Sequence, residues 1–143
     1  CILAGALLLV LTKVGSWRII VSGFLGAAFM AFIFNLLGGS YPNNDLMNFP
    51  WYNHLIVGGL AFGVVFMATD PVSAAQTFKG KWIYGFLIGL FAVMIRVFNP
   101  AYPEGIMLAI LLMNVFAPTI DHFVIESNVK KRKKRVKAQV KTA

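Results

Sequence analysis

The sequence is poor in charged residues and in cysteine. Only 13% of its 143 residues are charged, against about a quarter in ordinary soluble domains, whereas 59% are apolar and the mean hydropathy is +0.76. So few charges would not cover the surface of a soluble domain, and so apolar a chain is not disordered. The single cysteine, Cys1, excludes a disulfide framework and a cysteine-rich metal cluster. These absences indicate a membrane protein.

The start of the sequence also lacks a leader. Cys1 falls directly within an apolar run, with no charged residues before it and no small-residue cleavage site after it. We therefore expect the chain to be the C-terminal portion of a longer protein. A lipid-modified Cys1 is the alternative.

The net charge of +8 is concentrated at one end. Eight of the thirteen Lys and Arg residues lie between Lys130 and Lys141, after the last apolar stretch. Such a cluster orients a membrane protein and contacts anionic lipid, so we expect no nucleic-acid partner. The sequence predicts two parts: a transmembrane helical bundle over residues 1–123 and a basic cytoplasmic tail over residues 124–143.

Apolar segments predict an all-α fold, a polytopic bundle of transmembrane helices. They lack the alternation of strands, and a helix needs about 20 residues to cross the hydrocarbon. The second segment has that length, whereas the third and the fifth meet a proline or a charge after about 15 residues, which predicts short, interrupted helices. The five segments are Ile2–Thr12, Trp17–Leu37, His54–Thr69, Trp82–Phe98 and Ile106–Ile120.

Basic residues predict the orientation of the segments. Twelve of the thirteen lie in the tail or in the two loops on the same side, and Arg96 alone lies on the other side. Because basic loops stay in the cytoplasm, the C-terminus is predicted to be cytoplasmic and Asn99–Gly105 and the loop around Asn43 to be external. We also expect Arg96 to pair with Glu104, since an unpaired charge at that depth is unfavourable.

Two glycine pairs predict close helix packing. Gly59-x-x-x-Gly63 and Gly85-x-x-x-Gly89 place small residues one turn apart, so that a neighbouring backbone can approach. We expect packing within the chain, and a dedicated subunit contact is the alternative.

Two carboxylates are the candidate ion-binding residues. Asp70 and Asp121 close the third and the fifth segments, each near a proline, Pro71 or Pro118, and both on the predicted cytoplasmic side. Interrupted helices in corresponding places are the sequence pointer to a transporter ion site. Carboxylate and carbonyl oxygens suit a hard cation such as Na⁺, so both residues are predicted to lie on a Na⁺ path.

Two phenylalanines precede Asp70 at helical spacing. Phe62 and Phe66 lie four residues apart and share one face of a helix. They are candidates for a gate that narrows a hydrated path above the carboxylate. The alternative is that they pack against neighbouring helices while Asp70 caps or anchors a loop.

At these motifs the chain resembles the B subunits of the bacterial Na⁺-pumping NADH:quinone oxidoreductases. The related D subunits of Rnf complexes share Ala-Thr-Asp-Pro-Val but are not expected to carry the motif that begins at Asn99, so the B subunits match better. The matching stretches are Ser16-Trp17-Arg18-Ile19-Ile20, Phe66-Met67-Ala68-Thr69-Asp70-Pro71-Val72-Ser73-Ala74, Gly80-Lys81-Trp82, Ile95-Arg96-Val97, Asn99-Pro100-Ala101-Tyr102-Pro103-Glu104-Gly105, and Phe116-Ala117-Pro118 with Asp121-His122.

The resemblance implies a multi-pass subunit of a six-subunit pump in the bacterial inner membrane. Such a pump is a translocase that oxidises NADH, reduces ubiquinone and exports Na⁺. The B subunit is a bundle of about ten helices in two halves, similar to ammonium and urea transporters, and this chain resembles the second half.

The resemblance also implies flavin cofactors. In the family, FMN is esterified to a threonine in a Ser-Gly-Ala-Thr type motif, and riboflavin is bound as well. The motif is absent here and Thr69 does not match it, so the FMN site and most of the quinone site are expected upstream. A passive solute channel and a structural membrane anchor are the alternatives outside the family's redox chemistry.

Overall fold

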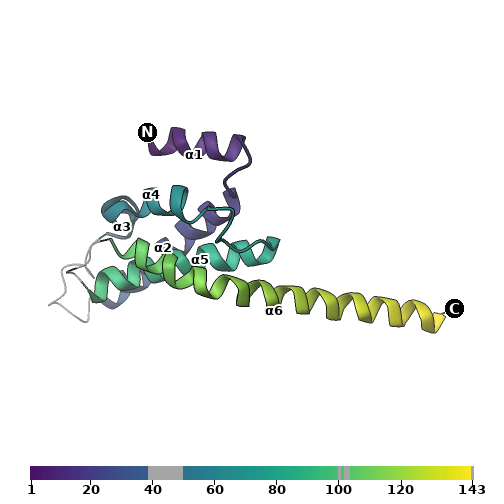
Figure 1. Cartoon of the computed structure of the whole chain (residues 1–143). Helices are drawn as coiled ribbons and strands as arrows, with labels where there is room; N and C mark the ends of the chain where they lie inside the picture. The colour runs from purple at the N-terminus through teal and green to yellow at the C-terminus, as the bar shows by residue number, and fades with distance from the viewer. Residues whose placement is uncertain (39–49, 100, 102–103, 143) are drawn as a thin grey trace.

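The computed structural model describes residues 1–38, 50–99, 101 and 104–142 (Figure 1). Over these residues it contains helices and no strand, which confirms the all-α prediction. Three helices are long and apolar enough to cross a membrane: α2 (Trp17–Gly38), α5 (Phe78–Phe98) and α6 (Gly105–Thr142). The first apolar segment forms the shorter α1 (Ile2–Leu11). Asn43, in the predicted external loop, lies outside the described residues.

Helices α2 and α5 pack at close range through small residues. A methyl group on Gly89 would overlap the carbonyl of Gly23, and one on Gly85 would overlap the side chain of Ser22. This contact is the intramolecular packing predicted for the Gly85-x-x-x-Gly89 pair. The buried core continues from α2 and α5 into α6 through Ile19, Ala27, Tyr84, Ile88, Ala92, Ala109 and Met113.

The third apolar segment is interrupted, as the sequence predicted, but it breaks within His54–Thr69 and not only at its end. It is divided into α3 (Trp51–Ile56), a 3₁₀ turn η1 (Val57–Gly59), α4 (Leu60–Phe62) and a π-helical turn η2 (Gly63–Met67). Gly59, where η1 meets α4, has φ +66°, a left-handed conformation that glycine adopts without a steric penalty. Gly59 and Gly63 therefore do not share one helical face, and Gly63 alone makes a close contact, with Ile106 of α6.

The fifth segment is not interrupted at Pro118 and continues far beyond its predicted end at Ile120, which corrects the short, interrupted helix predicted for it. Helix α6 passes through Pro118 and extends into the basic tail, so Asp121 lies inside a helix (Figure 1). A proline removes one backbone hydrogen bond, and this helix accommodates the loss. The decrease in hydropathy marks where the chain leaves the apolar zone, not where the helix ends.

Candidate functional site

The two carboxylates that are predicted to bind Na⁺, Asp70 and Asp121, lie in or against the loop that connects η2 to α5. Asp70 follows η2 and is exposed. Its side chain accepts hydrogen bonds from the Ser73 hydroxyl at 2.9 Å and from the Val72 backbone N–H at 3.3 Å. These two donors, the Ser73 hydroxyl above all, hold the pKa of Asp70 below its ordinary value. Asp70 is therefore an ionised group with local hydrogen bonds and access to solvent.

Asp121 makes contacts that join two helices. Its Oδ1 accepts hydrogen bonds from the Thr77 hydroxyl at 2.6 Å and the Thr77 N–H at 3.2 Å, and its Oδ2 accepts one from the Gln76 N–H at 2.7 Å. The Thr77 hydroxyl also caps α5, since it accepts a hydrogen bond from the Gly80 N–H at 3.1 Å. The carboxylate of α6 thus fixes the start of α5.

Asp70 and Asp121 both contact the same loop, but in the part of the chain that the structure describes they do not form part of a cluster that could bind one metal ion. Asp70 begins the loop and Asp121 binds its last residues, so both lie at the same end of the bundle. The amide of Gln76 braces the loop between them, because its Nε2 donates to the carbonyl of Pro71 at 2.6 Å. Among the described residues, no group of three or more His, Cys, Asp or Glu side chains could hold a metal ion.

A small polar cavity of about 120 Å³ lies beside Asp70. Lys13 and Ser16 of the α1–α2 connection line it together with Lys81 of α5. The Lys81 ammonium donates a hydrogen bond to the Ser16 hydroxyl at 2.9 Å. From the sequence, Lys81 was only one of the twelve basic residues that predict the orientation of the segments in the membrane. Its place in the Gly80-Lys81-Trp82 stretch of the resemblance was the signal that could have found it.

The two predicted gate residues contact each other. The ring centroids of Phe62 and Phe66 are 4.9 Å apart, and each side chain is partly exposed in the described chain. The Phe66 ring also lies against Gly5 of α1, where a methyl group would overlap it. The pair therefore forms one aromatic surface between α1 and the turn of η2 that precedes Asp70.

The same end of the bundle carries aromatic residues next to the basic residues that are predicted to face the cytoplasm. Trp17 and Trp82 pack edge to face with their centroids 6.2 Å apart, and the Arg18 guanidinium lies 4.6 Å from the centroid of the Phe78 ring. The loops predicted to share one side of the membrane thus meet in the structure. Their assignment to the cytoplasm stays a prediction.

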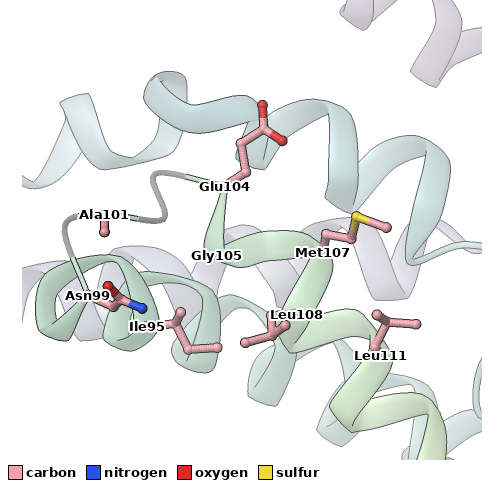
Figure 2. A pocket seen from close by; sticks show the side chains of 8 residues that line it. All are labelled: Ile95, Asn99, Ala101, Glu104, Gly105, Met107, Leu108 and Leu111. Atoms are coloured by element: carbon pink, nitrogen blue, oxygen red, sulfur yellow. The ribbon is translucent and has the colours of Figure 1, made fainter.

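Arg96, at the opposite end of α5, is buried and donates a hydrogen bond to the His54 carbonyl at 2.9 Å. Its expected partner Glu104 is exposed, on the rim of a 640 Å³ cavity. In Figure 2 the Glu104 carboxylate points away from Ile95 and Leu108, which line the same cavity. Arg96 thus contacts a backbone carbonyl of α3, and its pairing with Glu104 stays a prediction.

Comparison with known proteins gives the same family at the level of sequence. The profile of the NQR2, RnfD, RnfE family matches residues 1–130. The chain is 55% identical over 134 residues to the B subunit of the Na(+)-translocating NADH-quinone reductase of Chromohalobacter salexigens, covering 94% of this chain and 32% of that protein. It is 53% identical over 131 residues to the protein of the same name from Pseudomonas aeruginosa, covering 92% and 32%. The chain therefore spans about a third of the length of these relatives.

Proposed function

Because the chain belongs to the NQR2, RnfD, RnfE family, we propose that it is part of the membrane-embedded B subunit of a redox-driven sodium pump. The pump couples NADH oxidation and ubiquinone reduction to Na⁺ export. The names of the similar relatives favour this function over an Rnf-type electron-transport subunit, which lies within the same family. The other subunits of the complex and the lipid of the bacterial inner membrane are its partners.

Within this pump, we assign Asp70 and Asp121 to the cytoplasmic entrance of the Na⁺ path. The observation that supports this role best is the exposed Asp70 carboxylate, which directly follows a broken helix and faces a polar cavity. Broken helices with adjacent carboxylates are the usual setting of transporter ion sites. Asp70 attracts the cation and supplies oxygen ligands, while Asp121 adds negative charge and holds the loop in place.

The aromatic pair Phe62 and Phe66 acts as the gate next to Asp70. Phe62 ends α4, Phe66 lies in η2, and their rings are in contact, so a small rearrangement where α4 meets η2 would change the gate. A π-helical turn is rare in proteins and, where it occurs, it often lies at a functional site. The gate would limit leakage of ions between turnovers.

The flavins belong to the same proposal. FMN is expected on a threonine upstream of these residues, and the B subunit is expected to bind riboflavin as well. Flavin fluorescence of the full-length chain in a denaturing gel tests the covalent FMN directly. A passive channel or a structural anchor would carry no covalent flavin.

The Na⁺ role is tested in the purified, fully assembled complex. Asp70→Asn keeps the volume of the side chain but removes the charge, so the Na⁺ concentration for half-maximal quinone reduction should rise by about three- to tenfold, the loss expected for one partly solvated charge contact. Flavin content and assembly should stay unchanged.

Glu126→Gln is the matched control for that experiment. It removes an exposed carboxylate of α6 that forms a surface ion pair with Lys130 at 2.8 Å. Its half-saturation should stay at the parental value. An unchanged half-saturation in assembled Asp70→Asn would refute the entrance assigned to Asp70.

A further inference from the structure

The last part of α6 projects beyond the rest of the molecule. Asp121 binds the first residues of α5, so this position marks the end of the bundle. Residues 122–140 continue from there as one helix, which corresponds to about 29 Å at 1.5 Å per residue (Figure 1). We call these residues the α6 extension. The first residue of the basic cluster, Lys130, lies about 14 Å along the helix from Asp121.

The α6 extension has two distinct faces. From Ile125 onward its exposed apolar side chains follow one another at intervals of four, seven and four residues and therefore fall within an arc of about 60°, whereas the exposed Phe123 lies outside this arc. A second stripe of lysines, Lys130, Lys134 and Lys137, lies about a third of a turn away. The members of the apolar stripe are Ile125, Val129, Val136 and Val140.

The apolar stripe is hollowed where the charge is densest. Val129 and Val136 line a shallow groove together with Arg132, Lys133 and Lys137. An apolar floor with a cationic rim fits a ligand surface that is both apolar and acidic. Water hydrates the lysine ammonium groups, whereas the valine side chains remain exposed apolar surface.

The α6 extension also carries strong like-charge repulsion. Basic residues three and four positions apart, such as Lys130 with Lys134 and Lys133 with Lys137, lie next to each other on the helix surface and destabilise it by mutual repulsion. The ion pair between Lys130 and Glu126, at 2.8 Å, relieves only the first turn of the cluster. A negatively charged partner along the helix would remove this repulsion.

We propose that the α6 extension docks its valine stripe and flanking lysines on an acidic surface of another protein. Anionic lipid, the contact that the sequence predicts for this cluster, is the alternative source of negative charge. Electrostatic attraction to a surface falls off over a Debye length of about 8–10 Å, and a straight α6 carries its distal lysines well beyond that distance from the bundle end. A protein that stands beside the helix reaches all of them. This inference does not depend on the sodium path.

The test places a photo-crosslinking amino acid on the stripe of the intact, purified complex. Val136→p-benzoylphenylalanine should yield an adduct with a second polypeptide, at a segment rich in Asp and Glu, identified by mass spectrometry. Lys133→Glu with Lys137→Glu should lower the adduct yield at least about fivefold, because it reverses the charges next to the probe. Lys133→Arg with Lys137→Arg preserves the charge and should leave the yield unchanged.

Membranes of defined composition separate the two sources of negative charge. In nanodiscs of phosphatidylglycerol and phosphatidylethanolamine, Leu112→p-benzoylphenylalanine, on the exposed side of α6 within the bundle, should give lipid adducts. Lipid adducts at Val136 would overturn the proposal in favour of a membrane-bound helix. The proposal also fails if Val136 gives no adduct with another chain, or if the yield ignores charge reversal.

Discussion

Asp70 and Asp121 carry the same functional group at the same end of the bundle, but their hydrogen-bond donors differ in origin. Those of Asp70 lie within three residues along the chain, and the carboxylate stays exposed. Those of Asp121 lie more than forty residues away, and the side chain is half-buried. Asp70 thus belongs to a local turn that faces solvent, whereas Asp121 makes a contact between two helices.

This difference indicates that Asp70 is suited to bind a cation, whereas Asp121 is suited to hold the loop and α5 in position. A carboxylate with two local donors keeps lone pairs free for a cation. Asp121 accepts three hydrogen bonds from Gln76 and Thr77, so most of its acceptor capacity is already used by the protein. Loss of Asp70 should therefore change ion binding, whereas loss of Asp121 should change the structure first.

The largest effect is expected from Asp121→Ala. The substitution removes three hydrogen bonds to an ionised acceptor and frees the start of α5, at a cost of about 2 kcal/mol. We expect the thermal midpoint of the complex, followed by tryptophan fluorescence, to fall by several degrees. Glu126→Ala, which breaks an exposed ion pair on the surface of α6, is the control. Equal midpoints for both variants would show that Asp121 does not hold the two helices together.

Much of the fold was predictable because long apolar segments have few alternatives to a helix. The predicted and observed limits of α2 differ by a single residue at its end, and those of α5 by four residues at its start. The break at Gly59 was missed because a glycine four residues before another glycine also fits a packing motif. The extent of α6 was missed because the tail, although charged, consists largely of good helix formers such as Lys, Arg and Ala.

The candidate site was predictable only in part, for a different reason. Asp70 and Asp121 stand out as rare charges at the ends of apolar segments. Their surroundings depend on tertiary contacts, such as the one between Asp121 and Thr77, that no local pattern encodes. Lys81 was overlooked in the same way, since its contact with Ser16 joins residues that lie far apart in the sequence.

Lys81 offers a smaller effect of opposite sign. Its ammonium borders the cavity of Asp70 and acts electrostatically on Asp121, so it competes with an incoming cation. Lys81→Met should lower the Na⁺ concentration for half-maximal quinone reduction by about two- to threefold. Lys79→Met removes an exposed charge two residues away and should have no effect. The same decrease in both variants would mean that only the general surface charge matters.

The smallest effect tests how the local turn tunes Asp70. The Ser73 hydroxyl stabilises the ionised carboxylate, so Ser73→Ala should raise the pKa of Asp70 toward its ordinary value of 3.8. Because the folded-state pKa is lowered, the stabilisation is present above pH 3.8 and is lost as the pH falls through the folded-state value. The variant should therefore become protonated at a higher pH than the parent. Infrared difference spectra of the carboxyl band, assigned with Asp70→Asn, measure this shift, and Ser127→Ala in the exposed part of α6 should leave it unchanged. If the Asp70 band titrated identically in Ser73→Ala and the parent, the hydroxyl would have no part in keeping Asp70 charged, and the local turn would differ from the Asp121 contact only in exposure.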